Sequence, residues 1–572
     1  MSKKKQNSQK SQPVSTVENI VPKAQHNIWR WLAGILLITF IAYTPMFSDL
    51  KEFTNWDDDG YITDQPLIKS LDGESISKMF ETSSVVMLNY HPLTMLSLAI
   101  DYQRAYDDTD NTLSVAPFAA TNIILHLINT ALVFVLLYRL SKKRIWAAAL
   151  PALLFGIHPM HVESVAWLSE RKDVLYCCFF LLSCITYLRY IDKQQYGMLA
   201  LSFILFVAAC LSKAMATPLP VVLLLIDFLE NRKFTSKVWL EKLPYFAVAI
   251  WLGYLTLGIQ DKAIADAEYF NFGQRVMFAS YGLFMYWVKL VAPLGLSAIY
   301  PYPATGEGLP FIFYIAPLVA IAVIVLPVWL ARSNKERQRE TLFGIGFYLA
   351  MILLVLQFLS VGQAIMADRY SYVAYIGPLF ILGLYMNDWI QNPRYKNLAL
   401  AIAGAFSLVC VLLTYQRIAV WNDSKTLWAD VIDKYPYEVK QDGKNAVVVK
   451  RGVKTAYKNM GDYYASHQQF DSAYVYYNVL VSAGTKDAEV WSNLGNIYAI
   501  KNNLQGAIDA YTKAIALDAS NFENYLKRGL MNLRLNNCAA VIPDMDKVIQ
   551  LNPSFKDAQA IKQKCQELLS KQ

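Results

Sequence analysis

Three consecutive carboxylates lie within the polar run Asn55 to Tyr61. Adjacent carboxylates repel one another, so the pKa of at least one should be raised unless a cation lies near. A carboxylate in this position could take a proton from a hydroxyl group of an acceptor. A solvated acidic turn that ends at Gly60 explains the same residues equally simply. The side chains concerned are Asp57, Asp58 and Asp59, followed by Tyr61.

Four basic side chains lie next to apolar runs, where they could hold a phosphate group. Gathered at one membrane face near the acidic run, they would suit a lipid-phosphate head group. For each one, pairing with a structural carboxylate is the competing interpretation. The four are Arg171, Lys172, Lys213 and Arg369.

Four histidines and one glutamate are further candidates for a substrate site. Polar side chains inside an apolar run usually face protein or a cavity, so interhelical hydrogen bonding is the simpler interpretation for His126. The pair at 158 and 161 could suggest a metal, but Pro159 disfavours a helix through it and no zinc motif matches. We therefore predict no metal site. The candidates are His91, His126, His158, His161 and Glu163.

The composition that surrounds these residues is that of a membrane protein. Hydrophobic residues make up 55% and charged residues 17% of the 572 residues, against roughly 25% charged in soluble domains. Residues 1–28 form a basic tail, 29–419 are dominated by apolar runs, and 420–572 have a soluble composition. We therefore expect an all-α chain, with a polytopic helical domain followed by a soluble module.

Basic loops set the expected orientation, because loops rich in Lys and Arg stay in the cytoplasm. The segment 275–294 contains two basic residues and ends near a proline, so we expect it to be re-entrant or interfacial. The remaining runs give about 11 crossings, which place the outer loop 48–116 and the module 420–572 outside. The expected crossings are 29–47, 117–138, 145–157, 173–190, 197–212, 216–229, 243–260, 310–331, 341–360, 370–387 and 397–416.

The net charge of +8 and the seven cysteines exclude other classes of function. The basic residues lie in short clusters between apolar runs, without the basic face and stacking aromatics of a nucleic-acid binder. Five of the cysteines lie inside apolar runs, and no C-x-x-C pair occurs, so we expect no disulfide framework. The basic tail precedes an apolar run without a cleavage site, which indicates a retained first helix.

The C-terminal module has a 34-residue period, which is that of tetratricopeptide repeats. Gly461, Gly495 and Gly529 mark it, and an aromatic residue stands four positions before each glycine. Such repeats are helix pairs that form a concave surface for a peptide or protein. We place repeats near 454–487, 488–521 and 522–555. Residues 421–436 resemble the second helix of an incomplete repeat, and 439–453 an insertion.

Taken together, these motifs resemble the multi-spanning O-mannosyltransferases with C-terminal tetratricopeptide repeats, the TMTC type, and their bacterial relatives. The resemblance covers residues 50–390 in family order and continues through the repeats. It is carried by Trp56-Asp57-Asp58 with Tyr61, His91-Pro92-Leu93-Thr94, His126, the block from His158 to Asp173, Leu211-Ser212-Lys213, Leu225-Ile226-Asp227 and Asp368-Arg369-Tyr370-Ser371-Tyr372.

The resemblance implies a GT-C fold whose membrane domain binds a polyprenyl-phosphate sugar. It implies that Asp57, with Asp58 second, activates a Ser or Thr hydroxyl of a protein acceptor, with inversion at the anomeric carbon. We infer that Arg171, Lys172, Lys213 and Arg369 stabilise the leaving phosphate. No cofactor is expected beyond the lipid-linked donor, and the sugar, mannose or another hexose, is carried over from the family.

The amino-acid sequences of the outer loops are closest to those of bacterial relatives. This favours a bacterial inner membrane with the repeats on the periplasmic side. Two other functions remain open. The chain could be a GT-C transferase that acts on a glycan or lipid, or a membrane scaffold without enzymatic activity that presents the repeats to a partner.

Overall fold

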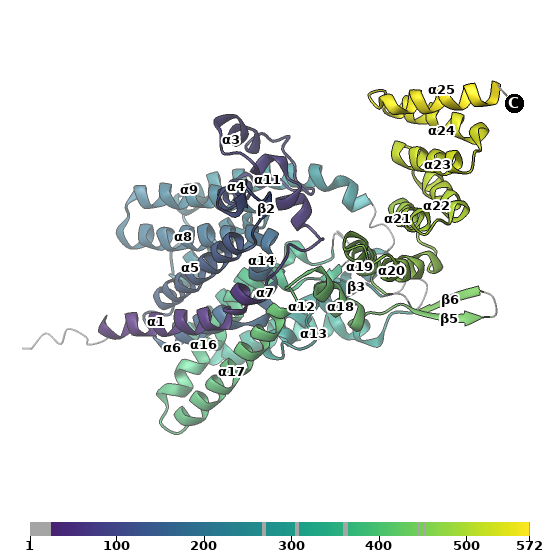
Figure 1. Cartoon of the computed structure of the whole chain (residues 1–572). Coiled ribbons are helices and arrows are strands. Elements are labelled where there is room, and N and C mark those ends of the chain that lie inside the picture. The colour runs from purple at the N-terminus through teal and green to yellow at the C-terminus, as the bar shows by residue number, and fades with distance from the viewer. Residues whose placement is uncertain are drawn as a thin grey trace, which may run out of the picture.

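The computed structural model describes residues 25–265, 270–303, 308–358, 364–442, 445–450 and 452–570, and most of them are helical (Figure 1). Its side chains are described except at 25–27, 260–265 and 439–450. The N-terminal end of α1 lies at one side of Figure 1 and the repeat helices at the other. The predicted fold class, an all-α polytopic protein with a helical repeat module, is confirmed.

Among the described residues, seven helices are long and apolar enough to cross a membrane, or eight if one bent pair forms a single span. The bent pair is the turn Asp368–Tyr370 with α15 (Ser371–Ala374) and then α16 (Ile376–Gln391), at an angle of 57°. Three shorter apolar segments, α6, α9 and α10 with its preceding turn, coincide with the remaining predicted crossings. The helices are α1 (Gln25–Ala42), α5 (Ala116–Leu140), α6 (Trp146–Ile157), α8 (Arg171–Lys193), α9 (Tyr196–Ser212), α10 (Leu219–Leu229), α11 (Ser236–Ala265), α13 (Phe311–Leu330), α14 (Lys335–Ile352) and α17 (Lys396–Ala419).

The loops that we expect in the cytoplasm gather at one end of the helices. Arg139 lies 3.2 Å from Glu230, and Lys142 lies 2.8 Å from Glu336. These ion pairs join the basic loops 139–144, 230–242 and 332–339, which lie far apart in sequence. Their common position agrees with an even number of crossings between 230–242 and 332–339.

Helix α12 (Phe272–Val291) covers the segment whose path was least clear from the sequence. It is not among the apolar helices that pass the length and hydropathy criteria in the described part of the chain. Near its start, the Phe278 ring lies 5.5 Å from that of Phe313, at the beginning of α13. Near its end, Lys289 reaches the carbonyl groups of 294–295, next to the first helix of the repeat module. Both ends of α12 therefore lie near segments on the repeat side, and its re-entrant or interfacial path stays a prediction.

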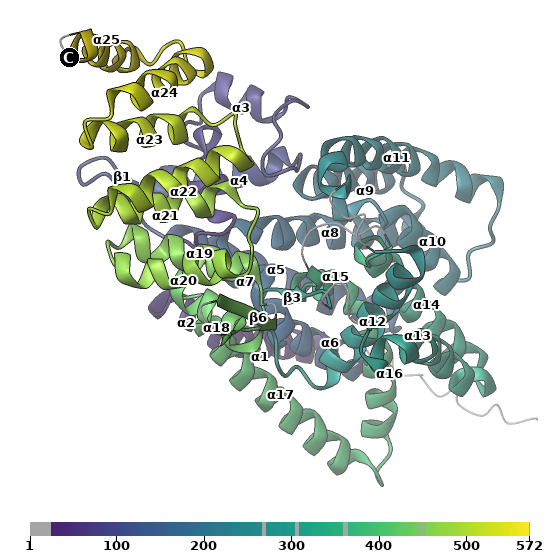
Figure 2. The same ribbon diagram turned by 90° about the vertical axis from the view of Figure 1, so that its right-hand side faces the viewer.

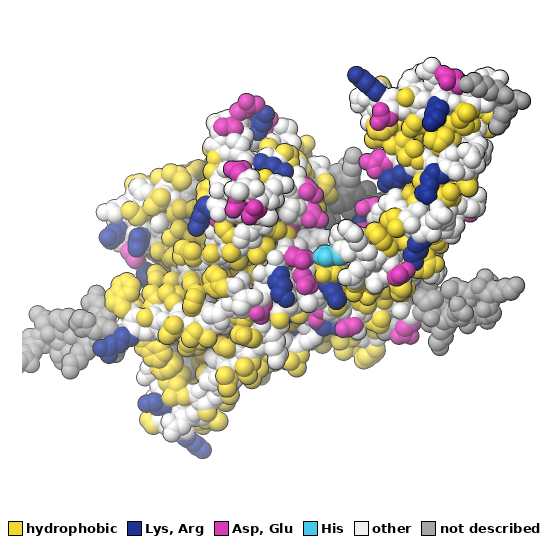
Figure 3. Space-filling model, in the orientation of Figure 1, with side chains coloured by type: hydrophobic (Ala, Val, Ile, Leu, Met, Phe, Trp, Pro, Cys, Tyr) yellow, Lys and Arg dark blue, Asp and Glu magenta, His cyan; other side chains and the backbone are white. Residues whose placement is uncertain are grey.

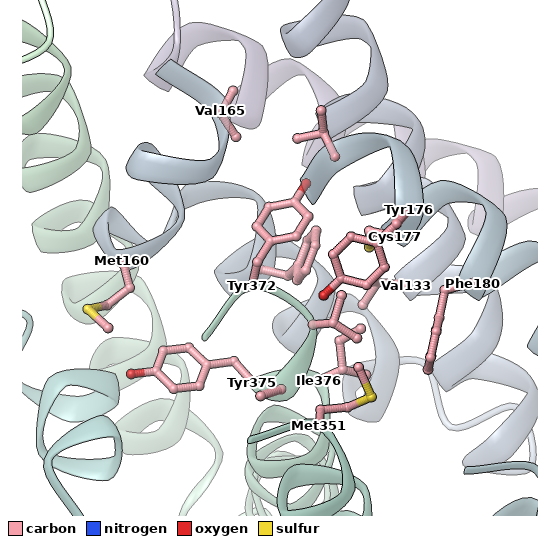
Figure 4. Packing of buried hydrophobic residues seen from close by; sticks show 14 of the residues in the cluster. Val133, Met160, Val165, Tyr176, Cys177, Phe180, Met351, Tyr372, Tyr375 and Ile376 are labelled. Atoms are coloured by element: carbon pink, nitrogen blue, oxygen red, sulfur yellow. The ribbon is translucent and has the colours of Figure 1, made fainter. Parts of the chain in front are cut away.

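Small residues allow the central helices to approach closely, as is common where membrane helices pack. A Cβ atom on Gly344 of α14 would meet the carbonyl oxygen of Gly377 at 2.8 Å. A Cβ atom on Gly383 would likewise meet the carbonyl oxygen of Ala147 at 2.8 Å. These approaches pack α16 between α14 and α6. Figure 4 shows the core beside them, where Tyr372 and Tyr375 pack among buried side chains of 160–165, α8 and α14.

The outer surface of the membrane helices remains apolar. Large side chains such as Tyr254 of α11 and Leu318 of α13 are 80% and 72% exposed. Hydrophobic side chains cover much of the helical body in Figure 3, while charged side chains gather over α3 and the repeats. This distribution suits helices whose outer faces contact lipid.

The first outer loop is folded into short elements rather than extended. Its longest helix, α4, begins at Pro92 and buries Met95, Leu98 and Ala99. Short segments in the other outer connections complete this side of the molecule. The elements are α2 (Pro45–Ser48), α3 (Gly73–Met79), α4 (Pro92–Ala105), β1 (Tyr106–Asp107) paired with β2 (Thr112–Leu113), α7 (Val162–Ala166), and β3 (Tyr300–Pro301) paired with β4 (Ala364–Met366).

The repeat module begins with α18 (Ser424–Lys434), in the segment interpreted as part of an incomplete repeat. The insertion that follows is an antiparallel hairpin of β5 (Glu438–Asp442) and β6 (Asn445–Lys450). Each of the three predicted repeats contains one helix pair, and a last helix stacks on the third pair. The helices are α19 (Lys454–Ser466), α20 (Phe470–Ser482), α21 (Ala488–Ile500), α22 (Leu504–Leu517), α23 (Phe522–Arg534), α24 (Cys538–Leu551) and α25 (Lys556–Ser570).

The repeat glycines are required because a side chain of the second helix occupies the space of a Cβ atom. A Cβ atom on Gly495 would lie 2.6 Å from the Tyr511 ring, whereas one on Gly529 would meet the terminal methyl group of Met545. We expect Gly495→Ala to destabilise the protein by about 1–3 kcal/mol, because a packed ring cannot yield. Gly529→Ala should cost less, since the end of a methionine can move. Thermal unfolding of both full-length variants in detergent tests this order, and equal melting temperatures would contradict it.

Candidate active site

The structure brings together charged side chains from four segments that lie apart in the sequence. Lys172, at the start of α8, places its Nζ 4.0 Å from Oδ2 of Asp57 in the first outer loop and 3.0 Å from Oε2 of Glu170. Lys213, which follows α9, lies 2.7 Å from Asp173 and also contacts Glu170. Arg369, before α15, pairs with Glu163. We call the following residues the charged cluster: Asp57, Glu163, Glu170, Lys172, Asp173, Lys213 and Arg369.

Asp57 is the accessible carboxylate of the charged cluster. Its side chain is 25% exposed, while those of Glu163, Glu170 and Asp173 are about 1% exposed. Burial raises the pKa of Asp57 above its ordinary value of 3.8, and the cation of Lys172 opposes that rise. An ionised carboxylate that is partly desolvated and open to the outside can accept a proton from a bound hydroxyl group.

Asp58 has a different environment, although it is the next residue. It is buried and accepts hydrogen bonds from the Thr54 backbone N–H at 2.8 Å, the Thr54 hydroxyl at 2.9 Å and the Ser169 N–H at 3.0 Å. Burial raises its pKa, and these bonds oppose the rise. Asp58 thus fixes the acidic loop to the segment before α8. Of the two predicted acidic residues, Asp57 is the more exposed and is the one that an acceptor can reach.

Asp59, the third carboxylate of the run, is half-buried. It accepts a hydrogen bond from Thr63, within the π-helical turn Asp59–Thr63. Burial, followed by the nearby charges of Asp64 and Asp462, raises its pKa. Its neighbour Asp462 belongs to α19, so the acidic loop also adjoins the first complete repeat.

The structure separates Arg171 from the other three predicted phosphate ligands. Its guanidinium group is fully buried, 2.7 Å from Asp101 and 2.8 Å from the hydroxyl group of Ser97. It also donates to Asn122 and to the carbonyl oxygen of Phe118. These bonds hold α4 against α5 and use every side of the guanidinium group. We therefore correct the assignment of Arg171 from phosphate ligand to structural residue.

Tyr61 and His91, two of the substrate-site candidates, lie beside the charged cluster. The Nζ atom of Lys172 lies 4.4 Å above the Tyr61 ring, and the rings of Tyr61 and His91 are 5.2 Å apart. His91 is buried, and its Nε2 atom has no hydrogen-bond partner among the described residues. Burial, aided by Lys172 and Lys213, lowers its pKa to about 3, so His91 is neutral at physiological pH.

The other three histidines hold the backbone of neighbouring segments and do not join the cluster. His126 bonds to the Tyr372 hydroxyl group at 2.8 Å and to the carbonyl oxygen of Gly156 at 2.9 Å. His158 bonds to the carbonyl oxygen of Leu290, and His161 to that of Phe155. We therefore interpret these three histidines as hydrogen-bonding residues between segments and not as substrate-site residues. No group of three or more metal-ligating side chains occurs in the described part of the chain.

Two kinds of site residue were not predicted from the sequence. Glu170 and Asp173 hold Lys172 and Lys213 in place. The sequence feature that could have identified these two carboxylates is their position beside Arg171 and Lys172 at the start of a helix. Four tryptophans, which we call the tryptophan stack, form a wall beside the cluster. Its rings lie 4.3–6.4 Å apart, and no sequence periodicity connects them. They are Trp56, Trp167, Trp421 and Trp428.

Comparison with known proteins finds one family model, several curated relatives and a solved structure. A family model described as "Tetratricopeptide repeat" matches residues 488–521. Curated relatives include "Protein O-mannosyl-transferase Tmtc1" of Drosophila melanogaster, 31% identical over 26% of this chain and 17% of that protein. "Protein O-mannosyl-transferase TMTC1" of Homo sapiens is 43% identical over 14% of this chain and 9% of that protein. "Protein O-mannosyl-transferase F38B6.6" of Caenorhabditis elegans is 21% identical over 72% of this chain and 59% of that protein.

Each of these matches covers less than two thirds of the relative's own length. Among solved structures, "Crystal structure of APC/C hetero-tetramer Cut9-Hcn1" is 12% identical, covers 83% of this chain and 89% of that chain, and has a TM-score of 0.23.

Proposed function

We propose, from the premise that this chain is a homologue of the TMTC-type O-mannosyltransferases, that it is a GT-C-type membrane glycosyltransferase. It transfers mannose or another hexose from a polyprenyl-phosphate donor to Ser or Thr hydroxyl groups of a protein outside the cytoplasm. The observation that carries this proposal is the position of Asp57, a partly exposed carboxylate among buried ion pairs at the outer ends of the helices.

In this reaction Asp57 takes the proton of the acceptor hydroxyl group while the hydroxyl oxygen forms a bond to the anomeric carbon. The bond from that carbon to the phosphate oxygen breaks on the opposite face, and the electron pair leaves with the polyprenyl phosphate. The configuration of the sugar is therefore inverted. Charge that develops on the leaving phosphate requires fixed donors, and Lys172, Lys213 and Arg369 are the cations placed to supply them.

These cations are held in place before any donor binds, because Glu163, Glu170 and Asp173 pair with them. Such preorganisation lets the cations stabilise a developing charge without first reorganising. A lysine ammonium group has three N–H donors, so a bound phosphate can share Lys172 and Lys213 with the carboxylates. His91, neutral and with a free ring nitrogen, can accept or donate one further hydrogen bond to the sugar or phosphate.

Direct transfer tests this function. The purified protein is incubated with polyprenyl-phosphate mannose and a Ser/Thr-containing peptide, and the peptide is analysed by mass spectrometry. We expect a peptide mass increase of one hexose. Hexose recovered only in glycan or lipid would favour a GT-C transferase that acts on those acceptors. Absence of transfer with any hexose donor would favour a membrane scaffold.

The same proposal requires the repeats to lie on the outer side, which for a bacterial protein is the periplasm. A reporter enzyme that is active only after export, fused behind Gln572, should therefore be active. The matched fusion in the loop 139–144 should be inactive. The reverse pattern would overturn both the orientation and the proposed access of an exported protein acceptor to Asp57.

The rate of transfer should depend on pH through Asp57. A base must be ionised, so kcat/KM should fall as the pH falls through the pKa of Asp57, which burial raises above 3.8. Lys172 opposes that rise, so Lys172→Met should move this acid limb to higher pH, while Lys172→Arg should leave it nearly unchanged. The measurement is the pH profile of kcat/KM for the three proteins. A limb that moves to lower pH in Lys172→Met would contradict the assignment.

A further inference from the structure

The backbone and side chain of Asn55 join the acidic loop to the repeat module. The Asn55 N–H donates to the hydroxyl group of Ser424 at 2.8 Å, and its side-chain amide donates to the carbonyl oxygen of Asn459 at 2.8 Å. Its side-chain oxygen accepts from the indole N–H of Trp428 at 2.7 Å. One residue, two positions before Asp57, thus makes three hydrogen bonds to α18 and α19.

Trp56 continues this connection toward the charged cluster. Its ring is stacked on Trp167 at 4.3 Å, with an angle of 14° between the planes, and meets the edge of Trp428 at 5.3 Å. Trp167 in turn lies 5.4 Å from the guanidinium group of Arg369 and 5.6 Å from Nζ of Lys172. The tryptophan stack therefore runs from α18 of the repeat module to two cations of the cluster.

Further bonds hold α18 against the membrane module on both sides of this contact. The N–H of Lys51 donates to the carbonyl oxygen of Asn422 at 3.1 Å, and Arg417 of α17 lies 2.8 Å from Asp430 of α18. Lys434 donates to the carbonyl oxygen of Leu296 at 2.6 Å. Figures 1 and 2 show the later repeats extending away from the membrane module, while α18 and α19 stay against it.

We propose that α18 and the start of α19 form part of the active site, where they position the loop that carries Asp57. Trp428, Ser424 and the backbone of Asn459 are positioning residues, and they act through Asn55 and Trp56. This inference rests on the proposed function for its catalytic consequence, but the contact itself does not depend on it. The repeat module is then fixed to the catalytic loop, not a tethered binding domain that moves freely beside it.

The physical reason is the sensitivity of proton transfer to geometry. A general base must lie within hydrogen-bond reach of the proton it removes, and a displacement of about 1 Å can reduce a rate on the order of 10²-fold. Asp58 fixes the loop on the side of the membrane module, through Ser169. Asn55 fixes it on the side of the repeats, so Asp57 lies between two anchored points.

The test is Trp428→Phe in the full-length protein, which removes the indole N–H and keeps an aromatic ring. We expect kcat for transfer to fall about tenfold or more, within the range given by a small displacement of the base, with KM for the donor unchanged, because Trp428 does not touch the proposed cations. The matched control is Trp491→Phe, in α21 of a later repeat, which should keep the wild-type kcat. A double variant of Asn55→Ala and Trp428→Phe should be no slower than Asn55→Ala alone, because both remove the same bond.

Hydrogen exchange gives a readout that does not require activity. Backbone amides of 54–61 should exchange faster in Trp428→Phe than in the wild-type protein or in Trp491→Phe. Trp428 is fully buried, so the smaller ring also lowers the melting temperature. The comparison is therefore made well below that temperature, with amides outside 54–61 as the reference for global opening. Unchanged exchange in this segment would overturn the inference, whether or not the wild-type protein transfers sugar. If exchange increases and the wild-type protein shows no transfer, the loop is positioned as inferred and the proposed function is at fault. An equal loss of kcat in Trp428→Phe and Trp491→Phe would also overturn the inference that α18 positions the acidic loop.

Discussion

Asp57→Asn is expected to reduce the rate of sugar transfer by about 10²–10⁴-fold, the usual contribution of a general base. The amide has nearly the same shape as the carboxylate but cannot take the proton of the acceptor hydroxyl group. The fold should not change, because the Asp57 side chain is partly exposed and Lys172 keeps Glu170 as a closer partner. The measurement is kcat in the peptide-transfer assay, together with the melting temperature of the protein in detergent.

Asp58→Asn provides the contrasting variant. Asp58 accepts three hydrogen bonds in a buried position, and an asparagine there must point its amide N–H₂ group at one of the donors. We therefore expect Asp58→Asn to lower the melting temperature, whereas Asp57→Asn keeps it and loses activity. Full activity in Asp57→Asn would exclude it as the base. Loss of activity in Asp58→Asn at an unchanged melting temperature would transfer that role to Asp58.

Arg171→Met is expected to destabilise the protein by about 3–5 kcal/mol, because it leaves a buried charge without its partner. Arg171 and Asp101 are 0% and 1% exposed and lie 2.7 Å apart. The remaining partners of Asp101 are the Thr121 hydroxyl group at 2.8 Å and Arg104 at 3.4 Å. Adding Asp101→Asn should recover part of the loss, since the buried charge then disappears. The measurement is the free energy of unfolding in detergent, or the melting temperature of the three proteins.

Arg104→Met is the matched control, because Arg104 pairs with the same carboxylate but is 63% exposed. Exposed pairs contribute about 0–1 kcal/mol, so this variant should be close to wild type. Equal destabilisation by the two methionine variants would contradict the structural role of Arg171. A stable Arg171→Met protein that binds the donor poorly would return Arg171 to the phosphate site.

The sequence by itself determined the features that repeat at short range. The 34-residue spacing of Gly461, Gly495 and Gly529 predicted three helix pairs, because each glycine faces a bulky side chain of its partner helix. The long apolar runs predicted the membrane helices, since only helices and closed barrels satisfy the backbone in lipid. Clusters of basic residues between those runs also predicted which loops lie together.

The tertiary structure decided between neighbours that the sequence treats alike. Asp57 and Asp58 are adjacent, yet one faces the cluster and the other accepts bonds inside the protein. Arg171 and Lys172 are adjacent at the start of α8, where successive residues point about 100° apart around the helix. One therefore faces α4 and α5, and the other faces Asp57 and Glu170. No local pattern shows which face of a helix start will meet which neighbour.

The contact between the acidic loop and the repeats lies furthest from what the sequence could reveal. Asn55 and Trp428 are 373 residues apart and share no periodicity. Their bond forms because α17 carries the chain back to the end of the helix bundle where residues 51–56 lie, and α18 packs beside those residues. Residue types and spacing thus indicated candidate carboxylates, candidate cations and a repeat module. Only the packing of distant helices decided which carboxylate is accessible, which cations face it and what holds its loop in place.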